Sequence, residues 1–298
     1  SAILINTPGT AAAAATAIDG YAMTKNGRAH EALTEAATAS FWGGIISTVV
    51  LLFFAPVLAK WAFDFGAQEK FLMAIFGLTI IASLSTKNIL KGLIMGCMGL
   101  LIACVGLDPI MGMPRFTFGT TYLMGGITIL PAVIGLFSIS QAFHTLADEI
   151  ASADPSAIAT YKTAKVSFRD FFRYPLTYLR SAIIGIIIGI IPGTGGDVSS
   201  YVSYNIGKSF AKERNEFGKG AREGVACCEA ANNAVVGGTL IPTLTLGIPG
   251  NATTAVLLSG LTIHGLTPGY ALFTTSGSIT YPFIMALFLA NVAFVLIG

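Results

Sequence analysis

Long apolar runs separated by polar stretches dominate this chain. A helix needs about 20 consecutive apolar residues to cross the hydrocarbon core of a bilayer. Runs near this length predict membrane-spanning helices at Ser40–Phe63, Ile89–Val105, Leu123–Phe143 and Ile279–Ile297. Another apolar run, Phe71–Leu84, is too short to cross unaided. The polar stretches Asp19–Glu35 and His144–Arg180 are expected to be loops, the second with an interfacial amphipathic helix or a partner-docking face. The pattern predicts an all-α, polytopic membrane protein.

Three motifs place helix-breaking and polar residues inside the apolar region from Ile190 to Gly269. They are PGTGG at Pro192–Gly196, EAANNA at Glu229–Ala234 and GGTLIPTLTLGIPGN at Gly237–Asn251. Non-helical backbone is tolerated at membrane depth only where it is buried in protein or lines a cavity. Interrupted helices of this kind form the substrate and ion sites of secondary transporters. The motifs therefore predict a transporter core in which two helix breaks lie close to one site.

The segment Ser181–Tyr204, with PGTGG at its centre, has basic residues on both flanks. Lys and Arg are enriched in loops on the cytoplasmic side of a membrane. The basic residues of His144–Arg180 and of Asn205–Gly224 therefore place both flanks on that side. We expect a re-entrant hairpin, which enters the membrane, turns at Gly and Pro, and returns. The next segment, Val225–Leu266, is expected to cross once with a break at Pro249.

A short internal repeat connects the two ends of the chain. Ile3–Ala17 (ILINTPGTAAAAATA) resembles Leu244–Leu258 (LTLGIPGNATTAVLL), with the Pro-Gly pairs aligned. The loop after the first copy is basic and the loop after the second is not, which predicts inverted repeats. Residues 1–180 would hold the remainder of the first repeat plus a cytoplasmic connecting loop, and residues 181–298 the first part of the second inverted repeat. Because the first copy lacks its hairpin, we interpret the chain as a fragment of a longer one.

Composition argues against a soluble protein. The 298 residues are 54% hydrophobic and 11% charged, with a mean hydropathy of +0.74, whereas soluble domains average about 25% charged residues. The basic residues cluster in loops, so they indicate topology and no nucleic-acid partner. The sequence has no G-x-x-x-x-G-K-[ST] motif, no motif that unites Ser, His and Asp, and no metal-type spacing of Cys with His. We therefore expect a transporter rather than an enzyme.

Gly-rich breaks expose backbone N–H groups, and a half-helix that begins there directs its positive dipole end toward the break. Two such ends, at Gly193–Asp197 and Gly250–Thr254, are expected to bind a carboxylate, with the break at Asn6–Thr10 opposite. The candidate substrate-binding residues are Asn6, Thr7, Gly9, Thr10, Gly193, Thr194, Gly195, Gly196, Asn232, Asn233, Gly250, Asn251 and Thr253. The candidate Na⁺ ligands are Asp197, Ser199, Thr243 and Thr245. The alternative is that these small polar residues only pack helices and satisfy the backbone.

Acidic residues near membrane depth are functional candidates because a charge there is costly. Asp197 and Glu229 are two such residues. For Glu229 the alternative is a structural ion pair with Arg222 or Lys219. Asp19 is expected to cap a half-helix, with cation binding as the alternative.

At these motifs the chain resembles the large membrane subunit of the tripartite tricarboxylate transporters, the TctA family. The matching stretches are Ile3–Met23, Gly106–Gly119 (GLDPIMGMPRFTFG), Ile191–Tyr204 (IPGTGGDVSSYVSY) and Phe217–Gly269. The chain departs from the family at Cys227-Cys228, where Ala-Pro is usual, and at Ala22, where Pro is usual.

The resemblance implies a multi-pass subunit of the bacterial inner (cytoplasmic) membrane, working with a small membrane subunit and a periplasmic solute-binding protein. It implies secondary active symport of a carboxylate, citrate in the best-known members, with Na⁺ or H⁺ as the coupling ion and no other cofactor. The alternative function is a stand-alone carboxylate symporter or a channel without a binding-protein partner.

Overall fold

The computed structural model describes residues 2–6, 8, 10–64, 66, 68–69, 71–72, 75, 89–108, 111–127, 143, 171–191 and 195–297, with only the backbone at 11, 89, 197, 252 and 297. Most of the predicted segments Phe71–Leu84, Leu123–Phe143 and His144–Arg180 lie outside the described residues. The described part is mostly helical, as predicted. Two helices, α3 (Ala29–Phe63) and α13 (Gly277–Ile297), are long and apolar enough to cross a membrane.

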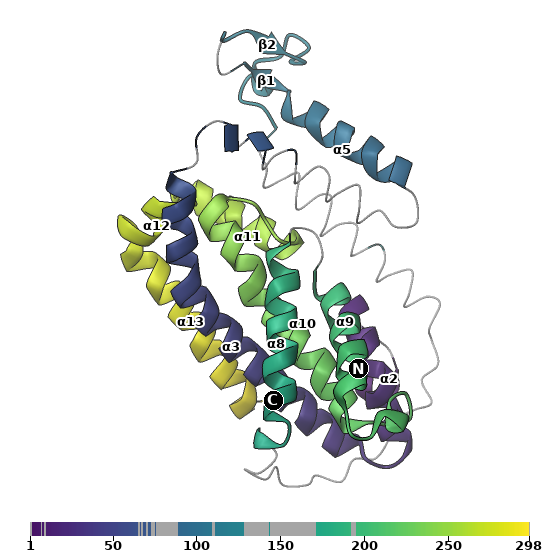
Figure 1. Cartoon of the computed structure of the whole chain (residues 1–298). Coiled ribbons are helices and arrows are strands. Elements are labelled where there is room, and N and C mark those ends of the chain that lie inside the picture. The colour runs from purple at the N-terminus through teal and green to yellow at the C-terminus, as the bar shows by residue number, and fades with distance from the viewer. Residues whose placement is uncertain are drawn as a thin grey trace.

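Helix α10 (Arg222–Leu246) lies at the centre of the bundle (Figure 1). It packs against α2 (Ala11–Lys25), α3, α8 (Pro175–Ile190) and α9 (Gly195–Phe210). Glycines on these neighbours allow close approach. A Cβ added at Gly185 of α8 would collide with the carbonyl of Ala231, and one added at Gly43 of α3 with the carbonyl of Ala230. Small residues at helix contacts are typical of membrane bundles.

Shorter helices complete the described part of the chain. They are α1 (Ala2–Ile5), α5 (Ile89–Ala103), α11 (Ala252–Ile263) and α12 (Tyr270–Thr274), with 3₁₀ turns at Thr121–Leu123 and Arg214–Glu216. After α5, which lies within the predicted span Ile89–Val105, an antiparallel pair of two-residue strands follows, β1 (Gly106–Leu107) and β2 (Pro114–Arg115). Figure 1 places α5 and these strands beyond one end of the bundle.

The expectation of a polar loop over Asp19–Glu35 is wrong. α2 continues to Lys25 and α3 begins at Ala29, so only a short turn separates the two helices. Asp19 and Glu35 are 1% and 0% exposed, and both accept hydrogen bonds inside the bundle. The alanine-rich sequence favours a helix, and the carboxylates of Asp19 and Glu35 face protein instead of water.

The segment around PGTGG forms two antiparallel helices. α8 ends at Ile190 and α9 begins at Gly195. The guanidinium carbon of Arg180, near the start of α8, lies 5.1 Å from the ring centre of Phe210, the last residue of α9. The second helix therefore runs back along the first, as Figure 1 also shows.

The two Pro-Gly breaks share the same backbone conformation at matched positions. Asn6 directly follows α1 and Gly247 directly follows α10, and both are left-handed, with φ of 53° and 70°. α2 and α11 each begin five residues later, after the N-caps Thr10 and Asn251. Each cap side chain accepts a hydrogen bond from the backbone N–H three residues on. These matched features lie at the positions that the sequence match aligns, and the inverted repeat itself stays a prediction.

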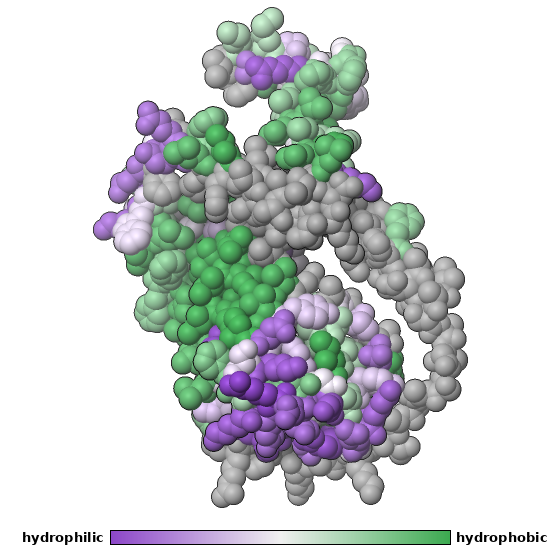
Figure 2. Space-filling view, turned by 45° about the vertical axis from the view of Figure 1, so that its right-hand side comes forward, coloured by the Kyte–Doolittle hydropathy of each residue, from purple (hydrophilic) through white to green (hydrophobic). Residues whose placement is uncertain are grey.

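Exposed apolar side chains follow the outer face of α8. Leu176, Leu179, Ile183 and Ile187 recur at helical spacing and are 46–77% exposed. Figure 2 shows a large apolar area across the middle of the bundle and hydrophilic residues gathered at one end. Exposed apolar surface of this extent indicates contact with lipid or with other chains.

Candidate functional site

Three polar residues of the EAANNA motif occupy one face of α10. Glu229, Asn232 and Asn233 are three and four residues apart, so their side chains lie on the same side of the helix. They are partly exposed, whereas the alanines around them are buried. The face contacts Thr16 of α2, Ser40 of α3, Gly196 of α9 and Asn291 of α13. Five helices therefore meet at this polar face.

The first turns of α9 and α2 converge on Asn232. A Cβ added at Gly196 would collide with Asn232 Oδ1 and would lie 3.5 Å from the Cβ of Ala12. Gly195 has a φ of 64°, a conformation that glycine adopts without strain. Two helix N-termini, with their positive dipole ends, thus lie beside one amide side chain. Such an arrangement can bind a carboxylate.

The second Pro-Gly break contacts α10 further along the helix. Thr239 follows Asn232 by seven residues, about 10 Å along the helix axis. A Cβ added at Gly250 would lie 2.6 Å from the Cβ of Thr239, and one added at Gly189 would lie 3.0 Å from the Thr239 backbone nitrogen. The second break and the end of α8 therefore meet on one turn of α10. The elements expected to form one site therefore lie in two groups along α10. The first turns of α2 and α9 lie beside Asn232, and the second break and the end of α8 lie beside Thr239.

Two of the predicted substrate-binding side chains serve as helix caps. Thr10 caps α2, and Asn251 caps α11 in a capping box with Thr254. Their side-chain oxygens are engaged, so the groups that remain for a ligand are the backbone N–H groups of the first turns. Thr253 is exposed beside the second cap. Four further candidates lie outside the described residues: Thr7, Gly9, Gly193 and Thr194.

Three of the candidate Na⁺ ligands donate their hydroxyl groups to backbone carbonyl oxygens of their own helix. Ser199 donates to the carbonyl oxygen of Gly196 at 2.9 Å. Thr243 and Thr245 donate to carbonyl oxygens one turn earlier in α10, at 2.6 and 2.7 Å. Only the backbone of Asp197 is described. Among the described residues, no group of three or more His, Cys, Asp or Glu side chains could hold a metal ion.

Glu229 accepts hydrogen bonds from two neutral hydroxyl groups. Thr16 donates to Oε1 at 2.6 Å, and Ser40 donates to Oε2 at 3.0 Å. The alternative was an ion pair of Glu229 with Arg222 or Lys219. Glu229 is in no ion pair among the described residues, and Arg222 pairs with Glu35 at 2.6 Å. The carboxylate of Glu229 therefore belongs to the polar face and not to the ion pair at the start of α10.

The polar contacts continue from Ser40 to α13. Asn233 donates to the carbonyl oxygen of Ser40 and, at 3.0 Å, to Oδ1 of Asn291. Gly44 provides the space, because a Cβ added there would collide with the same Oδ1. Sequence reasoning missed three members of this network, Thr16, Ser40 and Asn291. Asn291 did carry a signal, since an amide inside an apolar membrane helix needs a polar partner.

Asp19 anchors the chain just before α10, whereas the sequence led us to expect it to cap a half-helix. Its Oδ1 accepts hydrogen bonds from the backbone N–H groups of Gly218, Gly220 and Ala221 at 2.8, 2.8 and 3.0 Å. The hydroxyl of Tyr204 donates to Oδ2 at 2.8 Å. A negative charge is favourable at this end of a helix.

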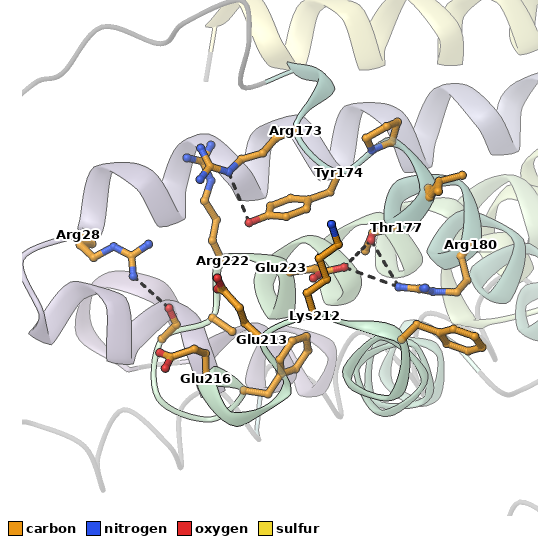
Figure 3. A pocket seen from close by; sticks show the side chains of 16 residues that line it. Arg28, Arg173, Tyr174, Thr177, Arg180, Lys212, Glu213, Glu216, Arg222 and Glu223 are labelled. Carbon is orange, nitrogen blue, oxygen red and sulfur yellow. Dashed lines mark hydrogen bonds and ion pairs between the residues drawn. The ribbon is translucent and has the colours of Figure 1, made fainter.

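A cavity of about 580 Å³ lies between the start of α8 and the connection from α9 to α10 (Figure 3). Its charged lining residues are Arg28, Arg173, Arg180, Lys212, Arg222, Glu213, Glu216 and Glu223. Arg28 pairs with Glu31 at 2.8 Å, and Arg180 with Glu223 at 4.0 Å. The hydrogen bond to Glu31 raises the pKa of the Arg28 guanidinium above its usual value. The basic flanks of the α8–α9 pair are therefore interleaved with carboxylates at one end of the bundle.

Comparison with known proteins identifies the family. The model of the "Tripartite tricarboxylate transporter TctA family" matches residues 1–298. The chain belongs to the TctA family. A relative of this TctA-family chain, an uncharacterized 52.8 kDa protein in the TAR-I ttuC' 3' region of Agrobacterium vitis, is 38% identical over 298 residues, which are 100% of this chain and 59% of that protein.

A second Agrobacterium vitis relative, from the TAR-II ttuC' 3' region, is 36% identical over 114 residues, which are 38% of this chain and 47% of that protein. No solved structure matches the chain. Membership of the TctA family confirms the resemblance seen in the sequence. Together with the two apolar helices long enough to cross a bilayer, it indicates a membrane protein of a transporter family.

Proposed function

We propose that this TctA-family chain forms the core of the large transmembrane subunit of an ion-coupled importer of tricarboxylates or related carboxylates. The observation that carries the proposal is the convergence of the first turns of α2 and α9 beside Asn232. Helix N-termini supply positive potential through their N–H groups, so an anionic solute can be held without a basic side chain. The family match supports tricarboxylates as the solute class.

The charge distribution supports a topology for the subunit. The cavity with its five basic residues lies at the outer ends of α8 and α9. Because basic residues favour the cytoplasmic side, this end faces the cytoplasm and α8–α9 is a re-entrant hairpin. Asn232 then lies inside the membrane. The matched breaks at Asn6 and Gly247 support an internal duplication, and the loop charges give its inverted orientation.

The partners follow from the family and not from any contact of this chain. The subunit works with a small membrane subunit and a periplasmic solute-binding protein, in the bacterial inner membrane. The proposed coupling ion is Na⁺, with H⁺ as the alternative.

The transport test uses the full-length subunit with its small membrane partner in proteoliposomes. Labelled citrate uptake is followed under an imposed Na⁺ gradient, with and without the purified binding protein. We expect accumulation that needs both the gradient and the binding protein. Accumulation without the binding protein would indicate a stand-alone symporter, and equilibration without accumulation would indicate a channel. If citrate is not taken up, a panel of other carboxylates decides the solute.

The site test changes the amide beside the two helix ends. Asn232→Asp keeps the side-chain shape but places a negative charge where the solute carboxylate would bind, and like charges brought together cost several kcal/mol. We expect the half-saturating citrate concentration to rise by about tenfold or more. Asn205→Asp makes the same change at an exposed position of α9 and serves as the control. Asn233→Ala and Gly195→Leu are expected to abolish uptake while the protein still inserts. Unchanged citrate affinity in Asn232→Asp would contradict this site.

A further inference from the structure

The carboxylates inside the helical bundle differ in how their charge is compensated. Asp19 accepts three backbone N–H groups at the start of α10. Glu35 is in a buried ion pair with Arg222. Glu223 accepts a hydrogen bond at 2.6 Å from a threonine and lies 4.0 Å from Arg180. Each of these three groups has either a cation or a helix start as its partner.

Glu229 has neither kind of partner among the described residues. Its two hydrogen bonds come from the neutral hydroxyls of Thr16 and Ser40, and no basic side chain of the described part pairs with it. A carboxylate at membrane depth, where the proposed topology places this face of α10, is costly unless a proton or a cation neutralises its charge. The neutralising charge at Glu229 must therefore come from outside the described chain.

We infer that Glu229 binds the coupling cation of the transport cycle, Na⁺ or H⁺, at a position between α2, α3 and α10. The inference rests on the proposed function and names the residue that couples the ion to the solute. Carboxylate and hydroxyl oxygens are suitable ligands for a hard cation, and the same carboxylate can instead take up a proton. The hydroxyl oxygens of Thr16 and Ser40 lie beside the carboxylate and could serve as further ligands of such an ion.

The position of Glu229 gives a physical reason for the coupling. Asn232 is three residues further along, so the two side chains are neighbours on the helix, with Cβ atoms roughly 5–6 Å apart. An unneutralised Glu229 would repel a carboxylate bound at Asn232. A cation at Glu229 removes that repulsion, so each ligand raises the affinity for the other by the same factor.

Other titratable groups face this part of α10 from the packed helices. They are Asp19 on α2, Glu35 on α3, Arg180 on α8, Tyr204 on α9 and Cys228 on α10 itself. Because several ionisable groups lie near Glu229, a pH profile of the wild-type protein does not identify Glu229. A substitution at Glu229 that keeps the shape of the side chain tests the role of this residue directly.

The experiment separates ion-driven accumulation from solute exchange, using the full-length subunit and its small membrane partner in proteoliposomes with the purified binding protein present. Accumulation of labelled citrate is driven either by a Na⁺ gradient at equal pH or by a pH gradient in Na⁺-free potassium buffer. Exchange of external labelled citrate for internal unlabelled citrate is measured at equal ion concentrations, where no net ion movement is needed. The gradient that drives the wild-type protein identifies the cation.

Glu229→Gln keeps the side-chain size but cannot carry a negative charge. We expect ion-driven accumulation to fall by roughly 5- to 150-fold, the usual range of coupling between two ligands, while exchange continues at the wild-type rate. Glu223→Gln makes the same chemical change six residues earlier in α10, at a paired carboxylate, and should keep coupling. Thr16→Val removes one oxygen donor and should raise the half-saturating cation concentration by about tenfold.

Each result bears on one of the two proposals. If Glu229→Gln still accumulates citrate as the wild-type protein does, the inference is overturned and the proposed function stands. If Glu229→Gln loses exchange together with accumulation, Glu229 belongs to solute binding or to folding, and the coupling role is again overturned. If the wild-type protein shows no ion-driven accumulation of any carboxylate, the proposed function fails and the inference with it.

Discussion

Replacing Asp19 with alanine should weaken the anchor at the start of α10 by an amount that its contacts allow us to calculate. Oδ1 of Asp19 accepts hydrogen bonds from the N–H groups of Gly218, Gly220 and Ala221. Gly218 is exposed, so its N–H can turn to water, whereas Gly220 and Ala221 are buried. A buried donor without a partner costs about 1–3 kcal/mol. For these two backbone donors alone, Asp19→Ala should lower the free energy of unfolding by about 2–6 kcal/mol. The buried Tyr204 hydroxyl also loses its acceptor, which adds to this loss.

The variant Asp19→Asn is the matched control, because it keeps an oxygen at the same place and removes the charge. Hydrogen bonds to charged groups contribute about 1 kcal/mol more than bonds between neutral groups, so two buried bonds predict a loss of about 2 kcal/mol. The assay is thermal unfolding of the purified full-length protein in detergent, followed by tryptophan fluorescence. In domains of about 150–250 residues, each kcal/mol changes Tm by about 2–4 °C.

A Tm for Asp19→Ala equal to that of the wild-type protein would refute the anchoring role, since two buried N–H groups cannot lose their acceptor without cost. The alternative role of Asp19, cation binding, predicts a different result. If the asparagine variant is as unstable as the alanine variant, and the loss depends on Na⁺, then Asp19 binds a cation.

Further substitutions test the packing, the buried ion pair and the second break, with Tm in detergent as the measurement. Gly185→Leu would drive a side chain into a carbonyl of α10 and should cost about 1–3 kcal/mol or more. Gly96→Leu, in open space on α5, is its control, and equal Tm values for both would contradict the close α8–α10 contact. Tyr178→Phe removes the hydroxyl that donates to Glu35 at 2.6 Å and should cost about 1.5–3 kcal/mol; no loss would mean that this bond does not stabilise the carboxylate. Gly247→Ala puts a Cβ on a residue with φ of 70° and should cost about 1–2 kcal/mol. An unchanged Tm would argue against a left-handed residue at this break.

Local features of the structure could be predicted because they depend on residues close together in sequence. The mostly helical fold follows from apolar runs of membrane length. The helix breaks follow from Pro, which lacks an N–H, and from Gly, which adopts left-handed conformations. Among the described residues, α8 ends at Ile190, just before the PGTGG motif, and α10 ends at Leu246, just before the break at Pro249.

The prediction of a loop over Asp19–Glu35 failed for a different reason. Charged and polar residues usually mark exposed chain, and nothing in this segment shows that its carboxylates are buried. Asp19 is held by the chain just before α10, and Glu35 by Arg222, both about 190 residues or more away in sequence. A segment whose polar groups find partners inside the protein can remain helical.

Apolar length, backbone restriction and family motifs are properties of short segments, so they predict a helical membrane protein of the TctA family without any knowledge of its tertiary contacts. Which group neutralises the negative charge of each carboxylate depends on how the helices pack. Asp19, Glu35 and Glu229 are alike as residues, but Glu229 meets its hydroxyl donors across 213 and 189 residues of chain. Contacts at such separation exist only once α2, α3 and α10 have packed together, since no local pattern specifies which side chains that packing brings into contact.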